Sequence, residues 1–367
     1  MIGHLILQNA THRPVRTAIT VIAVAVEVAL VIIVVGLTSG LLIDSAQRTE
    51  GVGADVMVRP PSSSMFIGFS GAPMPVSIGD KLGELPYVQA VAPVLVQFNS
   101  VKALEIVYGI EPSSFRAVSQ GFTFYTGRDL QDPDDILVDD VYAKSRNAHV
   151  GETLQLFGHD FHVAGIVEHG KGARLFVLMS TLEDMSGVRG KASVFFVKCD
   201  RSDHAAAAMD EIKQLLPPYT IQPLKDYAEM FTSSSVPYLA NFITVMIAIA
   251  VAIGFLVTFL SIYTTIIERT REIGVLKSLG ASKAYIIQVV ISEAALLCLG
   301  GFILGIGLSF LTKKIIVPIF FPSLPIHITA EWIIYSGAIA VAGGLLGAAY
   351  PAWLASRKDP VEALAYE

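Results

Sequence analysis

Four stretches of the sequence are almost entirely hydrophobic and long enough to cross a membrane. They cover residues 17–43, 238–267, 284–312 and 332–355. A transmembrane helix needs about 20 apolar residues, so each run predicts one span. The apolar part of a signal peptide is only about 7 to 15 residues long. We therefore expect the first run to remain in the protein as an anchor.

Residues 44–237 show a different pattern, in which short apolar strands alternate with amphipathic helices. The alternation predicts two β-α-β units, one near each end of this region, with a β-rich insert at about 125–190. The predicted strand, helix and strand are 54–60, 77–86 and 88–98 in the first unit, and 192–199, 203–216 and 219–223 in the second. Residues 1–16 predict a short amphipathic helix that Pro14 ends.

The distribution of Lys and Arg predicts how the spans are oriented in the membrane. Lys and Arg are more numerous in residues 1–16, 268–283 and 356–367 than in the short loop 313–331. Basic residues favour the cytoplasmic side, so both termini are expected in the cytoplasm and residues 44–237 outside. The chain is 53% hydrophobic and only 16% charged. The sequence therefore predicts an α-helical membrane protein with four transmembrane helices and an α+β extracytoplasmic domain inserted between helices 1 and 2.

Charge and residue spacing also exclude some classes of partner and site. The predicted outer domain has more acidic than basic residues, which argues against nucleic acid as a partner. Its histidines at 149, 159, 162 and 169 lack a strong ligand spacing, so we expect no metal site. No nucleophile, base and acid set is visible, and we expect no catalytic residues.

A compact charged helix joins the second and third spans. Glu268 and Arg271, and also Arg269 and Glu272, are three residues apart and can form ion pairs. Gly280 suits a helix end and Ser282 suits the N-cap of the next span. The apolar residues Ile273, Val275, Leu276 and Leu279 share one half of this helix, with no domain of the same chain expected to cover them. The helix could lie on lipid, but we favour docking to a cytoplasmic protein.

Several intramembrane residues are candidates for packing or function. A carboxylate inside a membrane is costly, and for both Glu27 and Glu293 we favour a structural contact between helices over proton transport. Pairs of glycines four residues apart predict close helix packing, within one subunit or across a dimer. They are Gly301, Gly305, Gly343 and Gly347.

The segment 62–77 is rich in Ser, Gly and Pro but also carries four large apolar side chains, Met65, Phe66, Ile67 and Phe69. We favour a loop folded back on its own domain. An exposed apolar lip that contacts a substrate or partner is the alternative.

Three stretches together resemble the FtsX-like, MacB-type permeases of ABC transporters. They are "ERTREIGVLKSLGASKAYI" (268–286), "VISEAALLCLGGFILGIGLSF" (290–310) and "YPAWLASRKDPVEALAYE" (350–367). The order of one span, a large outer domain and three spans is also similar. The resemblance implies that the segment joining spans two and three couples the permease to an ATPase. Its matching residues here are Glu268, Arg269, Arg271, Glu272, Ile273, Gly274, Val275, Leu276, Leu279 and Gly280.

The resemblance also implies partners. The sequence contains no Gly-x-x-x-x-Gly-Lys-Ser/Thr run, so we expect this chain to be no enzyme and to bind no cofactor itself. A separate ABC ATPase subunit would hold ATP and Mg. A second permease copy, identical or related, would complete the complex in the bacterial inner membrane, with an adaptor and an outer-membrane channel as further candidates. We expect export, with a lipoprotein-releasing permease or an FtsX-like activator of a cell-wall hydrolase as alternatives.

Overall fold

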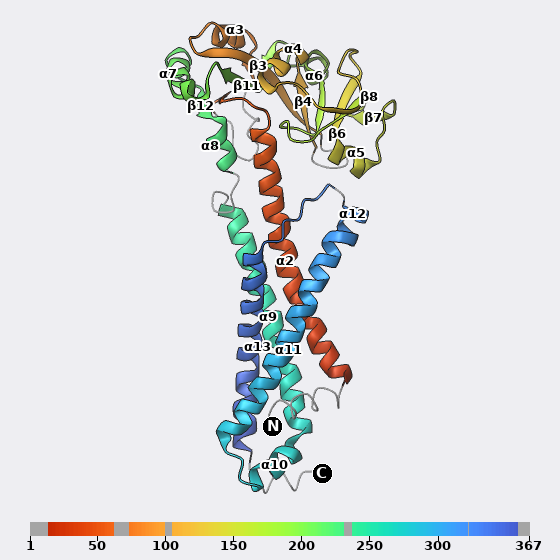
Figure 1. The fold of residues 1–367 in the computed structure, drawn as a ribbon, viewed down its shortest axis with the longest axis vertical. Coiled ribbons are helices and arrows are strands. Elements are labelled where there is room, and N and C mark those ends of the chain that lie inside the picture. The colour runs from red at the N-terminus through yellow and green to blue at the C-terminus, as the bar shows by residue number, and fades with distance from the viewer. Residues whose placement is uncertain (1–13, 62–72, 100–104, 231–236, 322, 359–367) are drawn as a thin grey trace. The chain divides into compact units, whose positions relative to one another are not determined.

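The computed structural model describes residues 14–61, 73–99, 105–230, 237–321 and 323–358. The amphipathic helix predicted at the N-terminus lies almost wholly outside these residues, and so do Met65, Phe66, Ile67 and Phe69. The chain divides into two compact units (Figure 1). We call them the helical unit, which comprises Met1–Gly40, Val236–Phe320 and Leu324–Glu367, and the inserted domain, which comprises Leu41–Ser235 and Phe321–Ser323.

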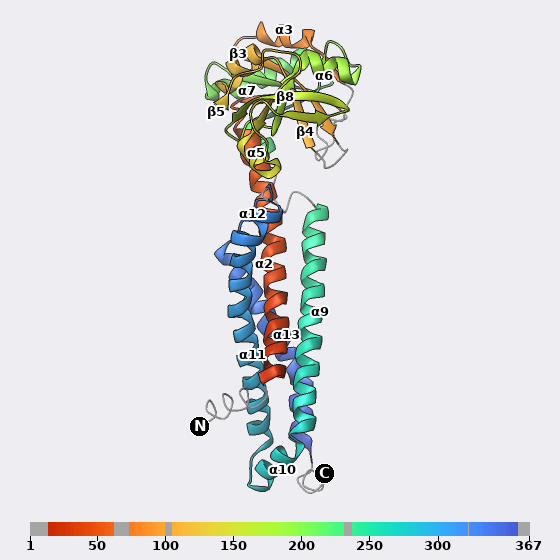
Figure 2. The ribbon, with the colours of Figure 1, turned by 90° about the vertical axis from the view of Figure 1, so that its right-hand side faces the viewer.

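Four helices of the described residues are long and apolar enough to cross a membrane, which confirms the four predicted spans. They are α2 (Pro14–Glu50), α9 (Pro237–Glu268), α11 (Lys283–Leu311) and α13 (Ala330–Arg357). Figure 2 shows the four helices running alongside one another, with the short helix α10 (Thr270–Ser278) between the ends of α9 and α11.

The helices extend beyond the apolar runs that predicted them. The 37 residues of α2 continue through the polar residues 44–50, which corresponds to roughly 55 Å of helix. After α11, a π-helical turn η2 (Thr312–Ile316) and α12 (Val317–Phe320) continue the helix, so the predicted loop 313–331 starts too early. Hydropathy marks only what suits lipid, whereas Lys, Gln and Glu are good helix formers that prolong a helix past its apolar part.

Ten strands of the described residues form one mixed sheet in the inserted domain. Its order is β12-β1-β11-β3-β4-β9-β6-β8-β5, and β7 pairs with β8. The bounds are β1 Val56–Arg59, β3 Val88–Asn99, β4 Glu105–Ile110, β5 Phe124–Gly127, β6 Asp135–Asp139, β7 Thr153–Leu156, β8 His159–Val167, β9 Leu175–Leu178, β11 Val194–Cys199 and β12 Thr220–Pro223. Two further strands, β2 (Met74–Pro75) and β10 (Lys191–Ala192), pair separately.

Two β-α-β units interleave in this sheet. Helix α3 (Ser77–Gly83) connects β1 to β3, and α7 (Ala205–Leu215), preceded by the 3₁₀ turn η1 (Ser202–His204), connects β11 to β12. β1 lies between β12 and β11 and is antiparallel to both. Each unit therefore encloses a strand of the other, the split β-α-β arrangement. The local sequence pattern predicted the two units, but it could not predict the order of their strands in the sheet.

The piece inserted between the units is larger than the predicted 125–190. It begins at β4, which pairs with β3, and it contains three helices in addition to its strands. These helices are α4 (Pro112–Ser119), α5 (Asp140–Arg146) and α6 (Met179–Ser186). The sequence pattern predicted mostly strands in this piece, so none of these helices of seven or eight residues was expected.

The sheet is buried on both faces. Val56 and Val58 face one apolar cluster, together with residues of α3, α6 and α7. Met57, between them, faces a second cluster that includes Phe115 of α4 and Tyr227 of α8 (Leu224–Glu229). This alternation is the period of two expected in a strand. It places Arg59, two residues after Met57, on the face of the second cluster.

Candidate functional site

Helix α10 carries most of the residues expected to couple the chain to an ATPase. Thr270, Ile273 and Gly274 are buried, at the spacing that places residues on one side of a helix. Ile273 packs with Ile262 and Ile266 of α9 and with residues of α11, and Leu276 packs beside them. The helix is thus held on one side by its own chain.

This packing corrects the expectation that the apolar half of α10 is left uncovered by its own chain. The predicted face divides into two parts: Ile273 is buried and Leu276 half-buried, whereas Val275 is 42% and Leu279 80% exposed. Sequence periodicity placed all four on one half of the helix, but the positions of α9 and α11 decide which quarter is covered. A partner would meet Val275 and Leu279, next to the exposed Arg271 and Glu272.

Charged residues fasten α10 to the neighbouring helices. Arg269 donates to Glu272 at 2.7 Å, as predicted, and its guanidinium also lies 3.5 Å from Glu293 of α11. Lys277 donates to the backbone carbonyls of Ser356 (3.0 Å) and Lys358 at the end of α13. Cations are favoured at a helix C-terminus because carbonyls there lack intrahelical partners. These contacts connect α10 and the residue before it to Glu293 in α11 and to the end of α13.

Both turn residues of this segment have the predicted geometry. Gly280 has a φ of +93°, which residues with a Cβ rarely adopt. The hydroxyl of Ser282 accepts a hydrogen bond from the backbone N–H of Tyr285, 3.2 Å away, and so caps α11.

Three of the four candidate glycines mark close approaches between helices of the same chain. A Cβ on Gly301 or Gly305 would overlap Val24 or Val28 of α2. A Cβ on Gly347 would lie 2.6 Å from the carbonyl oxygen of Phe255 in α9, and Gly343 faces Val251 of α9 at ordinary distance. These contacts all lie within one subunit.

Glu27 is buried where the spans meet. A Cβ on Gly254 of α9 would overlap the Glu27 carboxylate, so this side chain fills a notch in α9. This packing against α9 is a structural contact between helices, as predicted, although its Oε1 has no hydrogen-bond partner among the described residues. In α9 one turn further on, the buried hydroxyl of Thr258 also has no partner there. Glycine at 254 is what makes room for the carboxyl group.

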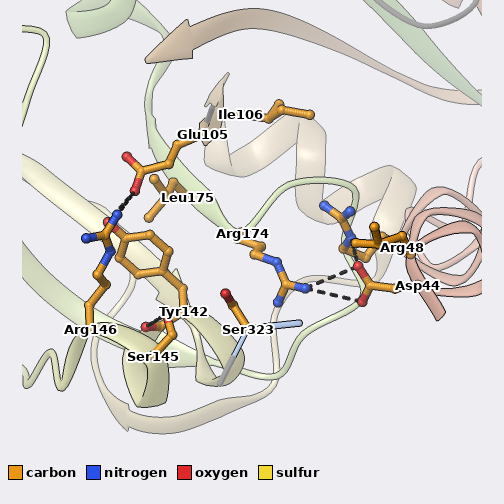
Figure 3. A pocket seen from close by; sticks show the side chains of 11 residues that line it. Asp44, Arg48, Glu105, Ile106, Tyr142, Ser145, Arg146, Arg174, Leu175 and Ser323 are labelled. Atoms are coloured by element: carbon orange, nitrogen blue, oxygen red, sulfur yellow. Dashed lines mark hydrogen bonds and ion pairs between the residues drawn. The ribbon is translucent and has the colours of Figure 1, made fainter. Parts of the chain in front are cut away.

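A polar cavity of about 240 Å³ lies within the inserted domain (Figure 3). Its walls come from the end of α2, from β4, β9 and α5, and from Ser323. On one side Arg146 donates to Glu105 at 2.9 Å, and on the other Arg48 donates to Asp44 at 3.0 Å. Leu41, Ile106 and Leu175 add apolar surface. The cavity could hold a small group with polar and apolar parts.

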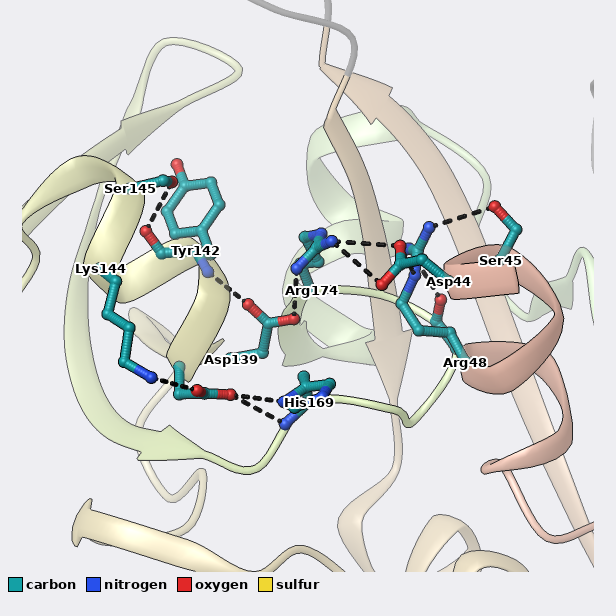
Figure 4. Close-up of polar contacts among 11 residues, drawn as sticks. Asp44, Ser45, Arg48, Asp139, Tyr142, Lys144, Ser145, His169 and Arg174 are labelled. Carbon is teal, nitrogen blue, oxygen red and sulfur yellow. Dashed lines mark hydrogen bonds and ion pairs between the residues drawn. The ribbon is translucent and has the colours of Figure 1, made fainter. Parts of the chain in front are cut away.

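Arg174 connects the two sides of a larger polar network (Figure 4). Its Nη2 donates to both Asp44 oxygens at 3.1 and 3.3 Å, and its Nη1 donates to Asp139 at 3.1 Å. Asp139 is fully buried and also accepts from the backbone N–H of Tyr142. Burial raises the pKa of Asp139, and Arg174 opposes that rise. The guanidinium of Arg174 thus bridges Asp44 at the end of α2 and Asp139 at the end of β6.

Asp140, next to Asp139, makes its own ion pairs. It accepts from Lys144 at 2.7 Å and from His169 at 2.8 Å. Burial alone would raise its pKa, but these partners hold the pKa of Asp140 below its usual range. Among the described residues no group of three or more His, Cys, Asp or Glu side chains could hold a metal ion.

Sequence reasoning did not single out Asp44, Arg174 or Asp139. One signal was available: Asp44 is the first charged residue after the first apolar run, at the point where α2 enters the inserted domain. Its partner Arg174 is 130 residues away in sequence, and no local pattern could connect them.

Comparison with known proteins covers both units. Residues 17–215 match the family described as MacB-like periplasmic core domain, and residues 244–360 match the FtsX-like permease C-terminal family. The macrolide export ATP-binding/permease protein MacB of Sodalis glossinidius is 26% identical over 400 residues, covering 99% of this chain and 60% of that protein. The protein of that name from Shewanella sp. is 27% identical over 395 residues, covering 99% and 60%.

The chain thus spans about 60% of the length of these curated relatives. A crystal structure of the periplasmic region of MacB from Actinobacillus actinomycetemcomitans aligns with a TM-score of 0.39 and 17% identity, covering 49% of this chain and 94% of that one. The first family match alone includes more than half of the chain, on both α2 and the inserted domain. The chain therefore belongs to the FtsX-like, MacB-type permease family of ABC transporters.

Proposed function

We propose that this permease couples ATP hydrolysis by an ABC ATPase subunit to a conformational change of its inserted domain, and that the change drives export of a substrate. The observation that carries the proposal is the division of α10 into two sides. Ile273 is held among α9 and α11, while Val275 and Leu279 are exposed on the other side. A partner bound to the exposed side could move the spans directly.

The ATPase subunit supplies ATP and Mg in this proposal, since the sequence contains no P-loop run. An apolar pair flanked by Arg271 and Glu272 suits a groove with complementary charges at its rim. The helical unit transmits movement of α10 through Arg269 to Glu293 in α11 and through Lys277 to the end of α13.

The inserted domain receives the movement through α2 in the same proposal. This helix is continuous from Pro14 to Glu50, and a helix transmits displacement along its axis because its backbone hydrogen bonds are satisfied internally. At its end Asp44 is held by Arg174, which also holds Asp139. The polar cavity beside this ion pair would change shape when α2 shifts.

We place this protein in the bacterial inner membrane, in agreement with its family and its four membrane helices. We infer cytoplasmic termini from the basic residues of the short loops. Two permease copies, identical or related, would assemble with two ATPase subunits. A periplasmic adaptor and an outer-membrane channel are proposed as further partners, because the relatives are named as macrolide export proteins.

Reconstitution tests the proposal. The full chain and its ATPase subunit are placed together in lipid nanodiscs, and ATP hydrolysis is measured with and without the permease. We expect the permease to change the hydrolysis rate and Leu279→Asp to abolish that change. Equal rates with and without the wild-type permease, despite stable association, would contradict coupling. Export is tested separately, by ATP-dependent uptake of candidate substrates into inverted vesicles.

A further inference from the structure

Arg59 is a buried guanidinium in the inserted domain, and no carboxylate of the described residues pairs with it. Its side chain ends β1 and is only 6% exposed, and its Nε and Nη1 have no hydrogen-bond partner among the described residues. The Tyr227 ring lies over it, with its centroid 4.8 Å from Cζ. Within the described part of the chain, Tyr227 is the one titratable side chain that acts on the charge of Arg59.

Gln222 places a further donor on the same face of the sheet. The β1–β12 register pairs Met57 with Gln222 and Arg59 with Thr220. Arg59 and Gln222 are therefore diagonal neighbours on one face, about 7–8 Å apart at the backbone. The Nε2 atom of Gln222 is buried and also has no partner among the described residues. Three donor nitrogens on one face thus lack acceptors.

The neighbouring sequence cannot supply an acid. Residues 62–72 follow β1 and residues 231–236 follow α8, and neither segment contains Asp or Glu. A cation over an aromatic ring is stabilised by about 2 kcal/mol when desolvated, but this leaves N–H groups without acceptors. Buried donors without acceptors are rare in proteins because each costs the desolvation of a polar group. Neither segment offers a negative charge to Arg59, so an anionic acceptor would come from another molecule.

We propose that Arg59 and Gln222 form a binding site for an oxyanion, the carboxylate or phosphate group of a ligand of the inserted domain. A guanidinium pairs with such groups through several parallel hydrogen bonds, and a neutral hydroxyl would leave the charge of Arg59 uncompensated. Tyr227 covers the site, so its ring must move for the ligand to enter. Tyr227 belongs to α8, a helix of only six residues, and short helices have little stability of their own.

The oxyanion could belong to a free solute or to a lipid headgroup, and the experiment separates these sources. The full chain is reconstituted in phosphatidylcholine nanodiscs, and inorganic phosphate or acetate is added against chloride at equal ionic strength. A second arm replaces part of the phosphatidylcholine by phosphatidylglycerol. The readouts are the thermal unfolding midpoint and hydrogen–deuterium exchange of peptides covering residues 220–229.

We expect wild-type protein to show a higher midpoint and slower exchange in at least one arm. A response to phosphate or acetate in phosphatidylcholine identifies a free solute, and a response to phosphatidylglycerol alone identifies a lipid headgroup. Arg59→Gln should lower the apparent affinity for the anion about tenfold or more, because hydrogen bonds to charged groups are the strongest in such sites. Without anion this variant should be as stable as wild type or more so, because it removes an uncompensated charge.

Arg189→Gln is the matched control, because Arg189 is exposed and pairs only at the surface with Asp184. It should respond to anions like wild type. If Arg59→Gln does not fold, Arg59→Lys and Gln222→Leu take its place, and both should respond more weakly than wild type. The proposal is overturned if wild type responds in neither arm, or if the Arg59 or Gln222 variants respond like wild type.

Discussion

Arg174 donates two hydrogen bonds to the carboxylate of Asp44, although the two residues are 130 positions apart in the sequence. Asp44 lies near the C-terminal end of α2, and Arg174 immediately precedes β9. The same guanidinium holds the buried Asp139 at the end of β6. Arg174 thereby connects the C-terminal end of α2 to the sheet.

The first prediction tests this connection. Arg174→Gln leaves Asp139 buried without its ion-pair partner, so the inserted domain should lose roughly 3–5 kcal/mol of stability. Chemical unfolding of the full chain, followed through the inserted domain, measures this loss. Arg189→Gln, which breaks an exposed pair, should change stability by at most about 1 kcal/mol. Equal stability of the two variants would show that Arg174 does not hold the network together.

A second prediction separates the two sides of α10. Leu279→Asp should prevent capture of the ATPase subunit without lowering the stability of the permease, since Leu279 is 80% exposed. Ile273→Ala should instead destabilise the bundle by about 2–5 kcal/mol, because Ile273 packs among α9 and α11. Pull-down and thermal unfolding measure the two effects. A Leu279→Asp variant that still binds the ATPase subunit fully would exclude this surface as the docking site.

The third prediction concerns the notch that accepts Glu27. Gly254→Ala places a methyl group where the carboxylate lies, and such overpacking should cost about 1–3 kcal/mol. Combining it with Glu27→Ala should restore part of the loss, because the second change vacates the space. Gly307→Ala is the control, since no atom lies within 4 Å of a Cβ at that position. Additive effects of the Gly254 and Glu27 changes would mean that the two residues do not share this space.

The fourth prediction concerns acid stability. Lys144 and His169 hold the pKa of folded Asp140 below its usual range, so this carboxyl binds its proton less readily in the folded than in the unfolded protein. Its contribution to stability is therefore present above the unfolded pKa of about 3.9 and is lost as pH falls through the lower folded pKa. Unfolding midpoints measured from pH 7 to pH 3 should fall less steeply for Asp140→Asn. Parallel curves for the variant and wild type would refute this.

The sequence by itself determined the four spans, the inserted domain and the turn residues of the coupling segment. Transfer into lipid depends on local composition, so hydropathy alone is sufficient for the spans. Helix caps depend on one or two residues, which is why Gly280 and Ser282 were identified. The motifs at 268–286 and 350–367 were likewise local, and they led to the family.

Only the tertiary structure decided which parts of these elements meet. The interleaved strands bring β1 beside both β11 and β12, and this pairing joins segments more than 100 residues apart. The burial of Ile273 and the exposure of Leu279 depend on where α9 and α11 pass. Hydrophobic attraction is not directional, so an apolar pattern shows that a face will be buried but not which element will cover it. For the same reason Arg174 and Arg59 look alike in the sequence. Arg174 is nevertheless paired with Asp44 and Asp139, whereas Arg59 is buried with no acid beside it in the described part of the chain.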